Sequence, residues 1–151
     1  IGDAKAITLQ AALELGRRRK EDTRDEVKKI SSAKHAYEIL RPYFDDLNHE
    51  EFRVLALSNA LNVIGNELIS KGGFTGTVAD GKMIFKYLLD KKACACILAH
   101  NHPSGTLKPS DSDIRLTKNL HEFGRMIGID VVDHLILVEN NFVSLKDSGY
   151  F

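Results

Sequence analysis

A run of small and apolar residues, from Ala93 to Ala99, is followed at once by two histidines and a loop rich in proline and glycine. An apolar run of this length that ends in such a loop predicts a buried strand. Side chains two apart on a strand point the same way, so His100 and His102 should converge where that strand ends. Ser110 and Asp113 share one face of the helix predicted to begin there. A strand, a loop and a helix are therefore expected to bring four polar side chains together.

The spacing of these four residues, H-x-H-x7-S-x2-D, favours a site for one zinc ion. His100, His102 and Asp113 offer two imidazoles and one carboxylate, which leaves the fourth position of a tetrahedral ion for water. That open position is typical of a catalytic site, and the segment offers no obvious fourth protein ligand. In the alternative interpretation, the histidines satisfy a polar loop and Ser110 caps the helix. Because the full spacing is rare by chance, we predict one Zn²⁺ per chain.

A zinc-dependent hydrolytic site also needs a base and a donor for the developing oxyanion. Glu50 and Glu51 are close competitors for the base, and Glu50 has the same strand parity as Phe52. His49 is more simply explained as a surface residue than as a ligand. The Ser110 hydroxyl has two competing roles, because it can cap the helix or donate to the oxyanion; we favour the second.

Helical and strand patterns are interleaved along the rest of the chain. Such a pattern, with some strands linked as hairpins, predicts an α/β fold with a mixed sheet that helices flank on its faces. The expected helices are 3–19, 32–43, 80–91 and 110–127, and the expected strands are 52–57, 61–69, 93–99, 130–138 and 142–145. A charged linker is expected at 21–29, a glycine-rich loop at 72–76 and a hairpin turn at Asn140-Asn141.

Composition narrows the classes of partner and compartment. The chain has 21 basic and 21 acidic residues, so no net field draws it to nucleic acid or to a membrane. No apolar stretch approaches the roughly 20 residues of a transmembrane helix, and nothing resembles a signal peptide. Cys94 and Cys96 lie on one face of a predicted strand, where a mutual disulfide is disfavoured. We interpret them as small buried thiols in a cytoplasmic protein, and not as soft-metal ligands.

The motif resembles that of the JAMM/MPN+ zinc metalloproteases, and the longer segment from Leu98 to Gly105 is similar to the bacterial RadC family. Further similarities lie at Asp133-His134-Leu135-Ile136 and at Phe142-Val143-Ser144-Leu145. The resemblance implies a JAB/MPN-like, cytidine-deaminase-like three-layer fold. It also implies that His100, His102 and Asp113 are zinc ligands, that Ser110 is the motif serine, and that Glu50 is the catalytic glutamate of an L-x-x-E-x-F pattern. Where the family often carries Pro-Arg after a Gly-Thr-x-x-Val stretch, this chain has Asp80-Gly81-Lys82.

The resemblance also implies two parts of the chain. Residues 1–24 are expected to be the end of a helix-hairpin-helix element followed by a linker, and 25–151 a RadC/MPN+-like zinc hydrolase domain. The chain begins with Ile1 and not with methionine, so we expect a fragment that starts inside the hairpin element. Any association of that element with nucleic acid should therefore be weak.

Three functions are compatible with these observations. The first is a zinc-dependent hydrolase of peptide or isopeptide bonds that acts on an unknown peptide or protein. The second is a DNA-repair-associated factor that binds or cleaves DNA, although two-metal nucleases need more carboxylates than this motif has. The third is a binding module that keeps the metal site without catalysis. The intact motif favours the first, and the oligomeric state stays open.

Overall fold

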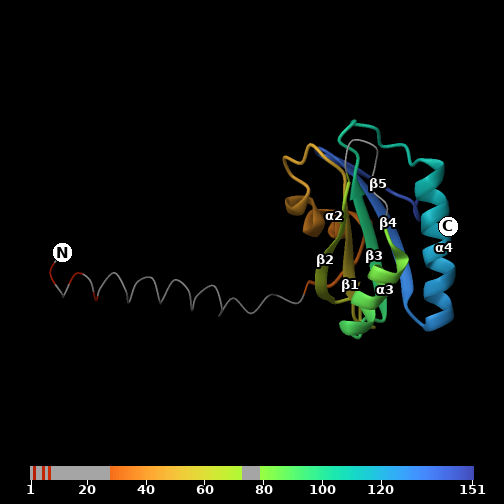
Figure 1. Ribbon diagram of the computed structural model, residues 1–151, viewed down its shortest axis with the longest axis horizontal. Helices are drawn as coiled ribbons and strands as arrows, with labels where there is room; N and C mark the ends of the chain where they lie inside the picture. The colour runs from red at the N-terminus through yellow and green to blue at the C-terminus, as the bar shows by residue number, and fades with distance from the viewer. Residues whose placement is uncertain (1, 3–4, 6, 8–27, 73–78) are drawn as a thin grey trace.

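The computed structural model describes residues 2, 5, 7, 28–72 and 79–151 (Figure 1). Most of the helix and of the linker expected near the N-terminus, and most of the glycine-rich loop, lie outside the described residues. The described elements, in chain order, are α2 (Ala33–Leu40), the 3-10 helix η1 (Arg41–Tyr43), β1 (Glu51–Leu57), β2 (Val63–Lys71), α3 (Gly81–Asp90), β3 (Ala95–Asn101), α4 (Asp111–Ile127), β4 (Asp130–Val138) and β5 (Asn141–Ser144).

The strands form one five-stranded sheet in the order β2-β1-β3-β4-β5. β3 and β4 are parallel and are joined through α4, whereas every other neighbouring pair is antiparallel. Parallel neighbours need a long crossover, and a helix supplies it here. The predicted α/β fold with a mixed sheet is confirmed.

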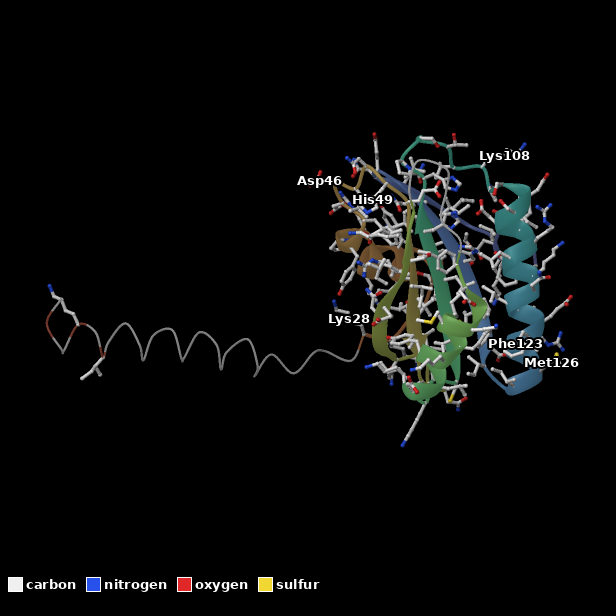
Figure 2. All side chains as sticks on the ribbon, viewed as in Figure 1. Lys28, Asp46, His49, Lys108, Phe123 and Met126 are labelled. Carbon is white, nitrogen blue, oxygen red and sulfur yellow. The ribbon has the colours of Figure 1, made fainter. Side chains whose placement is uncertain are left out.

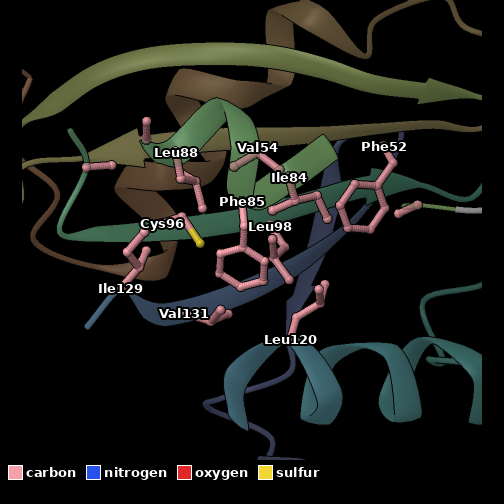
Figure 3. Packing of buried hydrophobic residues seen from close by; sticks show 13 residues of the cluster. Phe52, Val54, Ile84, Phe85, Leu88, Cys96, Leu98, Leu120, Ile129 and Val131 are labelled. Carbon is pink, nitrogen blue, oxygen red and sulfur yellow. The ribbon is translucent and has the colours of Figure 1, made fainter. Parts of the chain in front are cut away.

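Helices cover both faces of the sheet, as Figure 1 shows for α2 on one side and α4 on the other. One apolar core lies between the sheet and the pair α3 and α4, and contains Phe52, Leu88 and Leu98 (Figure 3). A second core lies between the sheet and α2, and contains Leu40 and Leu55. The two cores follow from strand alternation, because Val54 and Leu55 are sequence neighbours that point to opposite faces.

The ends of α4 are fixed by local sequence. Ser110 accepts a hydrogen bond from the Asp113 backbone N–H, and the Asp113 side chain accepts one from the Ser110 backbone N–H, which makes a capping box. Gly128 ends the helix in the left-handed conformation with φ of 75°, which glycine adopts without strain. The first of these two caps places Asp113 in the first turn of the helix.

Several predicted boundaries are wrong in detail. The helix expected over 32–43 ends at Leu40 and continues as a 3-10 turn, because Pro42 lacks the N–H of a further α-helical hydrogen bond. Cys94 is exposed and precedes β3, so only Cys96 is a buried thiol. The last hairpin turns at Glu139-Asn140, one residue earlier than expected, and Glu139 takes a positive φ of 41°.

Four structural elements meet at one edge of the sheet. β3 and β4 end there, β1 begins there, and α4 begins beside it. Figure 2 places Asp46, His49 and Lys108 toward this end of the molecule and Phe123 and Met126 toward the other. None of the helices in the described ranges combines the length and the apolar character that a bilayer span requires.

Candidate metal centre

His100, His102 and Asp113 converge at this edge. Each offers one donor atom, and these atoms lie within 4.8 Å of one another. The two Nε2 atoms are 3.0 Å apart. Nε2 of His100 is 3.4 Å from Asp113 Oδ1, and Nε2 of His102 is 3.6 Å from Asp113 Oδ2. The strand, the loop and the helix of the motif therefore meet as their spacing predicts, and they form a candidate metal site.

The donor spacing fits a small tetrahedral cation. Donors that lie about 2.0–2.1 Å from a tetrahedral zinc ion are about 3.3 Å apart, which is close to the distances between these three side chains. The chemistry of the set, two imidazoles with one carboxylate, is that of catalytic zinc sites. The residues therefore fit a divalent metal ion, with zinc as the natural candidate.

His102 is held by its own loop. Its backbone N–H donates to the Leu137 carbonyl at 3.0 Å, which ties the loop to the end of β4. Its Nδ1 lies 2.6 Å from the carbonyl oxygen of Thr106. A carbonyl only accepts, so Nδ1 carries a proton and Nε2 of His102 is the atom that faces the centre, where a metal ion would displace any proton that it holds. The turn that returns the loop to His102 includes Gly105, whose φ is 81°.

Asp113 is oriented by the cap of α4. Its Oδ2 accepts hydrogen bonds from the Ser110 backbone N–H at 2.8 Å and from the Ser110 hydroxyl at 2.6 Å. The hydroxyl also lies 2.8 Å from the Ser112 hydroxyl. The capping role of Ser110 is thus present in the structure, and its hydroxyl is committed to Asp113.

Electrostatics at the centre favour a negative carboxylate beside the imidazoles. Burial alone would raise the pKa of Asp113, but the adjacent His100 and His102 rings and the Ser110 hydroxyl hold it well below its ordinary value. In turn, the Asp113 carboxylate raises the pKa of His102 against the opposing effect of burial, and the charge of Glu50 adds to this rise. Asp113 is therefore held as a carboxylate, and a bound cation would take the place of the proton that His102 now shares with it.

A buried histidine, His134, lies directly behind His100. Its Nε2 is 2.8 Å from His100 Nδ1, and its Nδ1 is 2.6 Å from the Thr117 hydroxyl. Burial, with the nearby charge of His100, lowers the pKa of His134 well below its ordinary value, so the ring is neutral. The ring of Phe52 packs against both His100 and His134. His134 is therefore a hydrogen-bonded core residue, as its apolar surroundings in the sequence suggest, but it belongs to the surroundings of the centre.

The two candidate glutamates have different environments. Glu51 is buried, and its carboxylate contacts His49, Arg53 and Lys71 at 3.0, 3.2 and 3.4 Å. Glu50 is half-buried, precedes β1, and acts on His102 through its charge. The surroundings of the Glu51 carboxylate are those of a structural ion-pair network.

Asn101 fixes the backbone on both sides of Glu50. Its Nδ2 donates to the His49 carbonyl at 2.9 Å, and its Oδ1 accepts from the Glu51 N–H at 2.7 Å. The Glu50 carbonyl accepts a hydrogen bond from Gly72 at 2.8 Å. The residue between the two motif histidines therefore positions the segment that carries the candidate base. The sequence gives little sign of this link, because the two segments lie 50 residues apart.

A cleft of about 660 Å³ opens beside His102. Its walls come from three loops that meet at this edge: the segment before β1, the motif loop after β3, and the β4–β5 turn. Phe44, Leu47 and Pro103 give it an apolar part, whereas Asp46 and Glu139 add acidic groups. The cleft and the candidate centre thus share the side chain of His102.

The cysteines lie away from this centre. Cys94 and Cys96 are at the start of β3, whereas His100 is near its end. The group of potential ligands found among the described residues contains neither thiol. Neither thiol therefore belongs to the candidate metal group.

Comparison with known proteins agrees with this geometry. Residues 30–150 match the profile of the RadC-like JAB domain. The chain is 44% identical over 151 residues to a UPF0758 protein of Flavobacterium johnsoniae, and 39% identical over 150 residues to one of Methanococcoides burtonii. A UPF0758 protein of Staphylococcus aureus is 38% identical over 151 residues. The alignments cover 100%, 99% and 100% of this chain and 66% of each relative, so the chain spans about two thirds of their length. The chain belongs to the RadC-like JAB domain family.

Proposed function

We propose that this domain is a zinc-dependent hydrolase of amide bonds, acting on peptide or isopeptide linkages. The observation that carries the proposal is the convergence of His100, His102 and Asp113 beside a cleft that His102 also lines, with Glu50 within electrostatic reach. Zinc bound there would act as a Lewis acid on a carbonyl and would make water a stronger nucleophile at neutral pH. A single carboxylate ligand suits this chemistry better than two-metal cleavage of nucleic acid.

Glu50 is the base in this proposal. Its carboxylate accepts a proton from the attacking water as the new C–O bond forms, and delivers that proton to the nitrogen as the C–N bond breaks. The two hydrogen bonds of the Asn101 side chain, to the His49 carbonyl and from the Glu51 N–H, hold the backbone of Glu50 in place for both transfers. Glu51 is unsuited to the role, because its carboxylate already pairs with three basic side chains.

Ser110 is proposed to stabilise the oxyanion of the tetrahedral intermediate. Its hydroxyl now donates to Asp113 Oδ2, so the role requires the hydroxyl to turn from the carboxylate toward the substrate. The Ser110 backbone N–H, 2.8 Å from Asp113 Oδ2, remains to hold the carboxylate when the hydroxyl turns.

The cleft beside His102 is the proposed binding site for the substrate chain on one side of the bond. Its walls carry Asp45, Asp46 and Glu139 against a single guanidinium, that of Arg41. Arg41 is itself engaged, with Asn140 at 2.7 Å and Asp45 at 3.6 Å. We expect the preferred substrate to place a lysine or arginine there, with its aliphatic stem on the apolar part and its charge near the carboxylates.

The test incubates the full chain, loaded with zinc, with a library of linear peptides and of lysine-linked isopeptides, and detects new ends by mass spectrometry. His102→Ala removes a proposed ligand, and His35→Ala, on α2, is the matched control histidine. The proposal expects cleavage that a chelator and His102→Ala both abolish and that His35→Ala retains.

Two results would overturn the proposal. One is amide cleavage that survives His102→Ala, because the centre would then not perform it. The other is His102-dependent cleavage of nicked, branched or single-stranded DNA without any peptide cleavage, which would make the domain a nuclease.

A further inference from the structure

The Thr117 hydroxyl contacts two partners behind the candidate centre. Its Oγ1 lies 2.6 Å from the main-chain carbonyl oxygen of Asp113 and 2.6 Å from His134 Nδ1. A carbonyl oxygen only accepts, and a hydroxyl has one hydrogen to donate, so Thr117 donates to Asp113. Thr117 must then accept from His134, and this places the ring proton of His134 on Nδ1.

This proton position determines the next hydrogen bond. The His134 side chain is fully buried, and its ring nitrogens contact a hydroxyl and an imidazole, neither of which would compensate a buried positive charge. The ring therefore carries one proton, on Nδ1, and its Nε2 has a lone pair. The His134 Nε2 atom lies 2.8 Å from His100 Nδ1. Two lone pairs do not face each other at hydrogen-bond distance, so His100 Nδ1 must be the donor. Nε2 of His100 then carries no proton of its own, and it lies 3.0 Å from His102 Nε2 and 3.4 Å from Asp113 Oδ1. In the metal-free chain, the contact between the two Nε2 atoms is made by a proton on His102 Nε2, at the position where a metal ion would bind.

We propose that Thr117 and His134 are positioning residues that set the tautomer of His100 and so present its Nε2 to a metal ion. The Nδ1 proton of His102 is fixed by a shorter route, since this Nδ1 donates directly to the Thr106 carbonyl. A partner on the far nitrogen of a ligating histidine fixes the tautomer and the ring orientation, and increases the basicity of the ligand. The inference rests on the metal centre of the proposed function but not on amide hydrolysis.

The arrangement also links the two halves of the motif. The carbonyl at the end of the chain of hydrogen bonds belongs to Asp113, which is itself a proposed ligand. The series of hydrogen bonds that runs from Asp113 through Thr117 and His134 to His100 therefore joins the proposed ligand on α4 to the proposed ligand on β3. Thr117 and His134 are both almost wholly buried, with exposed fractions of 1% and 0%, so water does not compete for these contacts.

The first test compares two variants of one residue. Thr117→Val keeps the shape of the side chain and removes the hydroxyl, whereas Thr117→Ser keeps the hydroxyl and removes the methyl group. The zinc dissociation constant of each full chain is measured by competition with a fluorescent chelator, and folding by thermal melting. We expect Thr117→Val to bind zinc about 10–100-fold more weakly, as for other second-layer partners of metal ligands, and Thr117→Ser to bind nearly as tightly as the unmodified chain. Equal affinity of the two variants, whether lowered or unchanged, would overturn the inference.

A second measurement uses the unmodified chain, so it does not depend on whether a variant folds. Long-range ¹H–¹⁵N NMR correlations of the histidine rings in the metal-free chain distinguish the two tautomers. We expect the ring proton of His134 on Nδ1 and a proton on Nδ1 of His100. A neutral His134 with its proton on Nε2 would contradict the proposal. A chain that shows the expected tautomers and affinities without cleaving amides would refute the proposed hydrolysis and leave this inference intact.

Discussion

At the edge that carries the candidate centre, the two faces of the sheet use their buried polar residues differently. On the face covered by α3 and α4, His100 and His134 join into a chain of hydrogen bonds that ends on donor atoms directed at one point. On the face covered by α2, Asp133 accepts hydrogen bonds from the Ser144 hydroxyl and the Lys146 N–H at 2.7 and 3.2 Å, while Glu51 pairs with basic neighbours. One face leaves donors for a ligand, whereas on the other face Asp133 and Glu51 are engaged by neighbouring protein groups.

Residues that are adjacent in the sequence differ in whether they serve the candidate centre or the structure of the fold. Asp133 and His134 are adjacent in β4, and strand alternation sends them to opposite faces. Glu50 and Glu51 are also adjacent, with Glu51 in β1 and Glu50 just before it. A change of one position in the chain therefore separates a proposed functional group from a structural one. The following predictions test that separation, beginning with the largest expected effect.

Glu50→Gln is expected to lower amide hydrolysis by about 10²–10⁴-fold, because it removes the proposed base and keeps the shape of the side chain. Glu51→Gln is the matched control, and it should keep most of the activity since its carboxylate serves the other face. The rate on a substrate from the library and the zinc content of each variant are measured together. Loss of zinc from Glu50→Gln would instead make Glu50 a ligand, and similar losses of activity in both variants would remove the contrast between the faces.

Asp133→Ala is expected to lower the free energy of unfolding by about 1–3 kcal/mol, because it leaves buried donors such as the Ser144 hydroxyl without an acceptor. The zinc dissociation constant should change little, because the Asp133 carboxylate contacts none of the proposed ligands. Urea unfolding and chelator competition on the same preparation make the comparison. A variant that unfolds normally but binds zinc poorly would mean that Asp133 supports the centre.

The Glu51 network should contribute stability in a pH-dependent way. Burial raises the pKa of Glu51, but hydrogen bonds from His49, Arg53 and Lys71 outweigh it and hold the pKa below its ordinary value of 4.5. Stability from a carboxyl with a lowered pKa is fully present above that ordinary value and is lost as the pH falls through the folded-state pKa. The difference in unfolding free energy between the unmodified chain and Glu51→Gln should therefore be constant near neutral pH and shrink in acid. A difference that grows in acid would contradict the network.

The two cysteines provide the smallest contrast, at the far end of β3. Burial, with the charge of Asp130, raises the pKa of the Cys96 thiol to about 12, whereas Cys94 is exposed. Since the thiolate is the reactive form, iodoacetamide at pH 8 should modify Cys94 first and Cys96 only after denaturation. Mass spectrometry of the labelled chain follows both sites. Protection of Cys94 by zinc would place a metal at the wrong end of the strand.

Much of the centre could be predicted from local sequence. The apolar run before His100, the spacing to His102 and the Ser110 cap before Asp113 are short-range features, and the structure brings those three donors together. The mixed sheet followed from alternating patterns, although Pro42 shortened a helix and the last hairpin moved by one residue. Periodicity cannot resolve such a shift, because both positions are compatible with a two-residue turn.

The surroundings of the centre could not be predicted in the same way. His134 stood out only as a polar residue within an apolar strand, and its contact with His100 depends on the parallel register of β3 and β4. Thr117 and Asn101 can be named from the sequence as polar groups that could order the surroundings of the motif, but their partners cannot: Thr117 contacts His134, and Asn101 reaches a segment that precedes it by about 50 positions. These contacts are set by tertiary packing, for which the local sequence contains no direct signal.

The central claim is that one metal ion binds between His100, His102 and Asp113. Zinc K-edge X-ray absorption on the full chain with one equivalent of zinc tests it most directly, with Asp113→Asn as the companion variant. We expect nitrogen and oxygen donors at about 2.0–2.1 Å, with the outer-shell scattering of two imidazoles and no sulfur. Asp113→Asn should weaken binding and alter that first shell. A sulfur donor at about 2.3 Å, or a spectrum unchanged by Asp113→Asn, would contradict the claim.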